Sequence, residues 1–180
     1  MSPHRLRPFS VLLLAVIALG GCDFSDNDDV VVIGNDIIVR TFTVDGDEFD
    51  VSSDGILGSY QREVDALTEE VADDGAVLLY AGDEILFGSP QGTWTALPTT
   101  IGYDEDGDGF VDITLAFTFS YDLQDLYIDV VASSPIDFEA TLPETDFRLV
   151  LIPGDLFVGN ARTVDYSSYE AVRRAFALPE

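Results

Sequence analysis

The sequence contains no lysine, a single histidine, His4, and a single cysteine, Cys22. From residue 23 onward, no side chain can therefore serve as an imidazole base, a thiolate nucleophile or a Schiff-base amine. Zinc and copper sites that depend on histidine or cysteine ligands are excluded from the same part of the chain. An enzyme would have to use carboxylates, alone or with a hard cation, and no pair of acids stands out. We therefore predict that the protein is not an enzyme, with a carboxylate-based hydrolase as an alternative.

Basic side chains are also scarce, because only eight arginines oppose 34 acidic residues and the formal net charge is −26. Such a surface repels phosphate, so we predict no nucleic-acid partner. The acids are mostly aspartates spread along the chain, a composition that suits a protein working in high salt, where screening weakens self-repulsion. A salt-adapted protein and an ordinary acidic envelope protein both remain open.

The N-terminus has the pattern of an export signal. Arg5 and Arg7 precede an apolar run over residues 9–19, which is too short to span a bilayer stably. The Leu-Gly-Gly-Cys segment over residues 19–22 resembles the lipobox of bacterial lipoproteins. The resemblance implies cleavage before Cys22, a lipid on its thiol and a membrane-anchored protein of the cell envelope. The alternative is an ordinary signal peptide followed by an unpaired cysteine, which would be unusual in an exported protein.

The rest of the chain predicts one domain of short strands. The clearest alternation runs over residues 113–121 (ITLAFTFSY), where Leu115, Phe117 and Phe119 share one face. Frequent turns and the lack of a long amphipathic helix predict a mainly all-β fold, an antiparallel β-sandwich of immunoglobulin-like character. One short helical turn is expected at residues 68–75, and a short C-terminal helix is expected after the capping-box pattern Ser167…Glu170.

These patterns divide the chain into four parts. We predict a cleaved lipoprotein signal peptide over residues 1–21 and a lipidated cysteine with an acidic tether over residues 22–29. The β-sandwich domain is predicted over residues 30–154. A C-terminal extension with a short helix packed on the domain is predicted over residues 155–180.

Three segments in order carry a further resemblance. Residues 68–80 have the form T-x-x-V-x-x-x-G-x-V-x-L-Y, residues 94–98 the form W-x-x-L-P, and residues 147–153 read FRLVLIP. With leucine for valine at two places, they resemble the pattern of a family of small, mostly uncharacterised envelope lipoproteins of the Bacteroidota. The resemblance implies a lipid-anchored β-sandwich in the envelope and carries over no catalytic residue.

The stretch DEDGDGFVD over residues 104–112 is the one candidate metal site. Alternating hard oxygen ligands with a glycine at the sharp turn suit calcium, and the stretch resembles dockerin and thrombospondin-type calcium repeats. The twelfth position of an EF-hand-type loop is Leu115 instead of a bidentate glutamate, so a site here would be weak. The alternative is a plain acidic turn between two strands. The candidate ligands are Asp104, Asp106, Asp108, the Phe110 carbonyl and Asp112.

We predict a lipid-anchored, non-enzymatic envelope protein that acts as a structural or binding module, with calcium as its one candidate cofactor. A calcium-dependent adhesion or matrix module is the first alternative. Trp94 is a candidate for ligand binding on a sheet face, and plain core packing is its other interpretation. The predicted partner is the membrane, reached through Cys22. A protein or glycan partner, and the membrane leaflet that holds the anchor, are left open.

Overall fold

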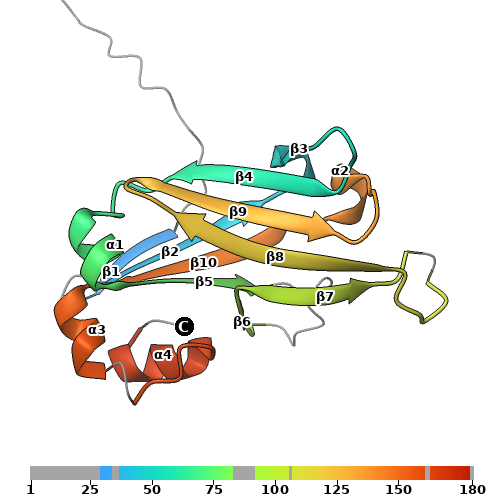
Figure 1. The fold of residues 1–180 in the computed structure, drawn as a ribbon. Helices are drawn as coiled ribbons and strands as arrows, with labels where there is room; N and C mark the ends of the chain where they lie inside the picture. The colour runs from blue at the N-terminus through green and yellow to red at the C-terminus, as the bar shows by residue number, and fades with distance from the viewer. Residues whose placement is uncertain (1–28, 34–36, 83–91, 106, 161–162, 179–180) are drawn as a thin grey trace, which may run out of the picture.

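The computed structural model describes residues 29–33, 37–82, 92–105, 107–160 and 163–178. They form two five-stranded sheets packed face to face (Figure 1). Sheet A has the order β1–β2–β10–β5–β6 and sheet B the order β3–β4–β9–β8–β7, with every pair antiparallel. The predicted antiparallel β-sandwich is confirmed. The strands are β1 (Asp29–Ile33), β2 (Ile37–Val44), β3 (Asp50–Val51), β4 (Leu57–Glu63), β5 (Ala76–Gly82), β6 (Thr95–Ala96), β7 (Thr99–Tyr103), β8 (Ile113–Tyr121), β9 (Asp125–Ala132) and β10 (Thr145–Ile152).

The helices are short and lie in connections or in the C-terminal segment. The expected helical turn and C-terminal helix are present as α1 and α4, but the described residues contain two further short helices. In α2, the Asp137 carboxylate caps the first turn by accepting from the Ala140 N–H at 3.3 Å. The helix α3 begins directly after Pro153, at a Pro-Gly pair that predicts only the end of a strand. The helical elements are η1 (Gly46–Glu48), α1 (Glu69–Asp74), α2 (Phe138–Thr141), α3 (Gly154–Asn160) and α4 (Tyr169–Phe176).

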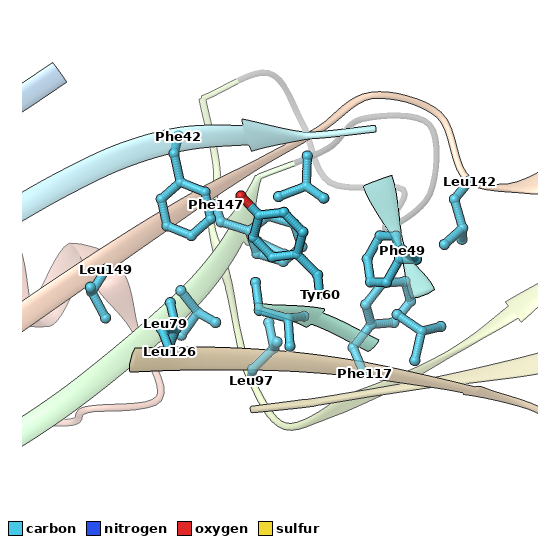
Figure 2. Close-up of a cluster of buried hydrophobic side chains, with 14 of the residues drawn as sticks. Phe42, Phe49, Tyr60, Leu79, Leu97, Phe117, Leu126, Leu142, Phe147 and Leu149 are labelled. Atoms are coloured by element: carbon cyan, nitrogen blue, oxygen red, sulfur yellow. The ribbon is translucent and has the colours of Figure 1, made fainter. Parts of the chain in front are cut away.

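The main core lies between the inner faces of the two sheets (Figure 2). In β8 the predicted alternation holds for Ile113, Leu115 and Phe117, which are all buried. Towards the end of the strand the apolar face leaves the core, because Phe119 is only partly buried and Tyr121 is exposed. Burial of these apolar faces supplies the main driving force for closing the sandwich.

A second apolar cluster covers the outer face of sheet A. Val150 and Ile152 of β10 point to this face and are fully buried there against Tyr169, Val172 and Leu178 of the C-terminal segment. The segment containing α3 and α4 therefore forms a third layer beneath sheet A (Figure 1). Burial on both faces explains why the second half of β10, from Leu149 to Ile152, is continuously apolar instead of alternating. No helix within the described residues is long and apolar enough to cross a membrane.

Candidate functional site

A cavity of about 640 Å³ lies between the start of α4 and the outer face of sheet A. Three parts of the chain that are distant in sequence meet there: the segment leading into β6, the middle of β10 and the first turn of α4. The lining residues are Gly92, Thr93, Trp94, Arg148, Ser168, Tyr169, Glu170 and Arg173.

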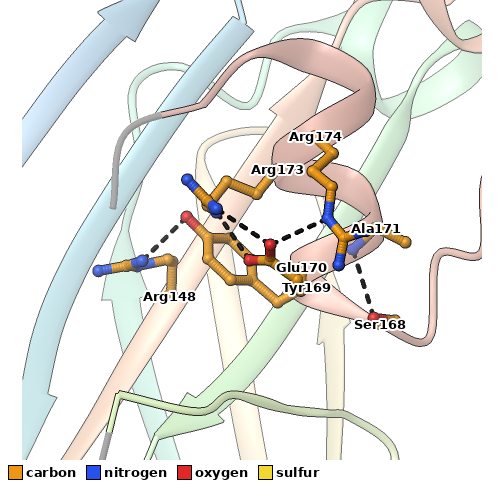
Figure 3. A network of polar contacts seen from close by, with 7 residues as sticks. All are labelled: Arg148, Ser168, Tyr169, Glu170, Ala171, Arg173 and Arg174. Carbon is orange, nitrogen blue, oxygen red and sulfur yellow. Dashed lines mark hydrogen bonds and ion pairs between the residues drawn. The ribbon is translucent and has the colours of Figure 1, made fainter.

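Arg148 of β10 is the charged residue that sheet A contributes to the described lining of the cavity. Its neighbours Phe147 and Leu149 face the inner core, so the alternation of β10 places Arg148 on the outer face of sheet A. Its Nε donates to Oγ1 of Thr41, the residue directly opposite on β2, at 3.2 Å. Its Nη1 donates to the hydroxyl of Tyr169 at 2.9 Å (Figure 3). These two hydrogen bonds fix the plane of the guanidinium.

The faces of this guanidinium are covered by aromatic rings. Its Cζ atom lies 4.0 Å from the centroid of the Trp94 ring and 4.9 Å from that of Tyr169. Both distances are within the range of a cation–π interaction, which stabilises a positive charge that is partly removed from water. Among the described residues, Arg148 is thereby held in place by aromatic rings and hydroxyl groups and not by a carboxylate.

The Nη2 side of the guanidinium has no hydrogen-bond partner among the described residues, and we call it the open edge. An arginine has five N–H groups, and Arg148 uses two of them on Thr41 and Tyr169. Within the part of the chain that the structure describes, the other three have no acceptor and no carboxylate pairs with Arg148. Arg148 is partly buried and is one of the residues that line the cavity. An arginine without an acidic partner is unexpected in a chain with 34 acids.

Trp94 reaches Arg148 because of a glycine in the neighbouring strand. The pairing of β6 with β5 sets Thr95 against Ala81, which puts Trp94 beside Gly82. A Cβ atom on Gly82 would lie 2.7 Å from two atoms of the indole ring. The missing side chain therefore lets the indole lie across β5. Trp94 is partly buried in the outer apolar cluster, as the packing interpretation predicts. It also lines the cavity, and ligand binding by Trp94 stays a prediction.

The helix α4 is anchored by its apolar side and carries its charges towards the cavity and solvent. Glu170 accepts two hydrogen bonds from Arg173, at 2.7 and 3.0 Å, and one from Arg174 at 2.9 Å (Figure 3). These bonds, first those from Arg173, lower the pKa of Glu170 to about 2. The predicted capping box is wrong by one position, because Ser168 is the N-cap and accepts from the Ala171 N–H. The Glu170 carboxylate turns instead to the two arginines.

Positive charge is concentrated at this place. Of the six arginines that follow Cys22 in the sequence, Arg148 and Arg173 line the cavity, whereas Arg174 is exposed, pairs with Glu170 and is not part of the lining. The described lining residues include two arginines and one glutamate, so together they carry a positive charge on a molecule of net charge −26. The cavity is the part of the described surface best suited to hold an anionic group.

The acidic stretch forms the connection between β7 and β8, which projects from the end of the sandwich opposite α1 and α3 (Figure 1). The Asp104 carboxylate accepts from three loop amides, those of residues 107, 108 and 109, at 2.8, 3.2 and 2.7 Å. Asp112 accepts from the Glu105 N–H at 3.0 Å, and Asp108 from the Phe110 N–H at 2.9 Å. These contacts are typical of acidic side chains that close turns.

The candidate calcium ligands are only partly placed by the structure. Asp106 lies outside the described residues. Among the residues that are described, no three acidic side chains are grouped as a metal site would need. Leu115 is fully buried, as its phase with Phe117 predicts, and is not available as a ligand. The calcium site stays a prediction from the sequence, as does the lipidation of Cys22, which also lies outside the described residues.

Sequence reasoning identified Trp94 but missed Arg148 and Tyr169. One signal for Arg148 was present: it is the only charged residue in the apolar run FRLVLI of residues 147–152. A charge inside a strand that is otherwise buried needs a specific partner or a function. The three segments that carry the lipoprotein resemblance also meet here, since Tyr80 packs against Tyr169 next to Trp94 and Arg148.

The fold and the cavity define this protein as a two-sheet β-sandwich with an arginine- and aromatic-lined pocket beside a C-terminal helix. Comparison with protein-family models, with curated proteins and with solved structures gave no match.

Proposed function

We propose that the protein is a lipid-anchored, non-enzymatic binding module of the cell envelope, and that the cavity beside α4 is its ligand site. The observation that carries this proposal is the state of Arg148. Its guanidinium is fixed by two hydrogen bonds and two aromatic rings, while its remaining donors open into the cavity. The volume of about 640 Å³ is in the range of small-molecule sites, which is roughly 300–1,000 Å³.

The acids of the cavity support binding over hydrolysis. Among the described residues that line it, Glu170 is the one carboxylate. Its low pKa keeps it ionised, and both of its oxygens already accept hydrogen bonds from arginines. A carboxylate hydrolase needs two acids, one of them able to hold a proton near the working pH. The described lining residues offer neither the pair nor the proton.

The membrane part of the proposal is supported by the lipobox-like segment that ends at Cys22. Cys22 is separated from the start of β1 at Asp29 by six residues. A fully extended chain of that length reaches about 25 Å at most, so a lipid on Cys22 would keep the sandwich close to the membrane.

The anchor is tested in full-length protein produced in a bacterium that processes lipoproteins. Wild-type protein should incorporate an alkyne-tagged fatty acid and sediment with membranes, and Cys22→Ser should lose both properties. Equal labelling of the two proteins would contradict lipidation at this position.

The ligand site is tested by equilibrium dialysis of the protein against small glycan and peptide fragments released from bacterial envelopes, with mass spectrometry of what is retained. Trp94 is the only tryptophan, so its fluorescence reports directly on the cavity. At least one compound should be retained by wild-type protein, shift this fluorescence and be lost in Trp94→Phe, which shortens the ring that stacks on Arg148. Identical retention by both proteins, or no retention at all, would contradict a ligand site at this cavity.

A further inference from the structure

The open edge of Arg148 restricts the chemistry of a ligand. A guanidinium presents parallel N–H groups that match the two oxygens of a carboxylate or of a phosphate. Here the bonds to Thr41 and Tyr169 hold the group in one orientation before any ligand arrives. Binding therefore costs little side-chain entropy, which favours recognition through these donors.

The charge of the whole molecule restricts the ligand further. Repulsion by a net charge of −26 grows with the charge of the approaching ligand, so a dianion is opposed twice as strongly as a monoanion. Within about 8 Å, the screening distance at physiological ionic strength, the positive charges of the described lining are Arg148 and Arg173. Arg173 is already engaged by Glu170, which leaves one guanidinium to receive one negative group.

The walls of the cavity indicate what the charged group is attached to. A space of about 640 Å³ is much larger than a carboxylate alone. Trp94 and Tyr169, whose ring centroids are 6.0 Å apart, form an aromatic wall next to Arg148. Flat rings of ligands pack on such walls with a gain beyond simple area burial. The hydroxyls of Thr93 and Ser168 add polar groups to the lining.

We propose that this cavity recognises a singly charged carboxylate carried on a ring, with the carboxylate on the open edge of Arg148 and the ring beside Trp94 and Tyr169. The inference rests on the proposed function, because it names the ligand class of the same site. A sugar acid and an aromatic acid share this chemistry, and the experiment distinguishes them.

The test is a titration of the full-length protein, followed by Trp94 fluorescence and by calorimetry, at about 0.15 M ionic strength. Glucuronate and benzoate are the charged probes, glucose and benzamide are their neutral counterparts, and glucose 6-phosphate is the dianion. At least one acid should bind about tenfold or more tightly than its neutral counterpart, because the neutral molecule leaves the donors of Arg148 unpaired. Glucuronate should also bind more tightly than glucose 6-phosphate.

Two substitutions that change the net charge equally are compared. The comparison separates the contribution of the Arg148 donors to binding from the effect of the net charge of the protein. Arg148→Met keeps an unbranched apolar stem against Trp94 but removes every donor, and should weaken binding of the acid about tenfold or more. Arg174→Met is the matched control, because its side chain is 73% exposed and does not line the cavity; it should leave binding within about twofold. If circular dichroism shows that Arg148→Met does not fold, Arg148→Lys is used. This substitution keeps the positive charge but loses the planar arrangement of N–H groups that a guanidinium presents.

Equal affinity for the acids and their neutral counterparts, or no binding of any probe up to about 10 mM, would overturn the carboxylate inference. So would binding of an acid that Arg148→Met leaves unchanged. The proposed function survives these outcomes if dialysis retains an uncharged compound that Trp94→Phe releases, and it fails if dialysis retains nothing. The two failures are therefore distinguishable.

Discussion

The attachment of the C-terminal layer to sheet A can be tested at a single hydroxyl group. Tyr80 of β5 is fully buried, its hydroxyl donates to the carbonyl of Tyr166 at 2.8 Å, and its ring packs edge-on against Tyr169 at 5.3 Å. The substitution Tyr80→Phe keeps the ring and removes only the hydrogen bond. It leaves a backbone carbonyl without its donor inside an apolar cluster, so we expect the free energy of unfolding to fall by about 1–2 kcal/mol.

Urea denaturation and a thermal melt both measure this loss. For a domain of this size, about 1 kcal/mol corresponds to roughly 2–4 °C in the unfolding midpoint, so the variant should melt about 2–8 °C lower. The dependence of the free energy on urea should not change, because the same surface is exposed on unfolding. A changed dependence would indicate that the C-terminal layer detaches separately from the sandwich.

The chain offers a matched control for this substitution. The hydroxyl of Tyr166 is buried and has no hydrogen-bond partner within the described residues. Tyr166→Phe makes the same chemical change as Tyr80→Phe but removes an unpaired polar group, so stability should stay the same or rise by up to about 1 kcal/mol. The reasoning is refuted if Tyr166→Phe destabilises as much as Tyr80→Phe, or if Tyr80→Phe has no effect.

Three further predictions concern the strand beside the cavity, the response to alkali and the acidic loop. Gly82→Ala puts a Cβ atom 2.7 Å from the Trp94 ring, so it should cost about 1–3 kcal/mol in a denaturant titration and shift the tryptophan emission; an unchanged spectrum would show that the indole does not lie there. Burial, and then the neighbouring tyrosines and Asp165, raise the pKa of Tyr80, so its contribution to stability is complete below about pH 10 and is lost as the pH rises further. The midpoint of wild-type protein should therefore fall more steeply above that pH than the midpoint of Tyr80→Phe, and parallel curves would contradict this. Asp104→Ala should speed hydrogen exchange of the three amides that it caps, whatever the metal present. The predicted calcium site requires in addition that calcium, but not magnesium, raises the wild-type midpoint by several degrees and that Asp106→Ala abolishes the rise.

The elements that the sequence predicted best are those with one face in the core. The strand β8 alternates from Ile113 to Phe117 because one side packs in the core between the sheets and the other is more exposed. The strand β10 was recognised as a strand, but its apolar run could not show that its outer face is covered by residues 169–178. The helix α3 was missed because it is seven residues long and follows a Pro-Gly pair. Helices of this length depend on packing more than on their own sequence.

The site was harder to predict because its residues come together only through strand pairing. Arg148 is placed by a bond to Thr41, which is 107 positions away in the sequence. The indole of Trp94 reaches Arg148 across Gly82. This arrangement depends on the register of β5 with β6, which no local sequence pattern specifies. Composition could exclude histidine and cysteine chemistry after residue 22, but it could not show that Arg148 lacks an acidic partner among the described residues. That information exists only in the tertiary structure.

The position of β10 in the middle of sheet A also determines the order in which the molecule can assemble. Neighbours in sheet B such as β7, β8 and β9 follow one another along the chain and can pair locally, whereas β2 and β5 have no strand between them until residues 145–152 arrive. Folding through such distant pairings is slow, because the entropy cost of closing a long loop comes before any stabilising contact forms. A chain that has emerged only as far as β9 can form meanders but neither a complete sheet A nor the cavity. Completion of sheet A and formation of the cavity are thus one late event, because both depend on the strand that arrives last.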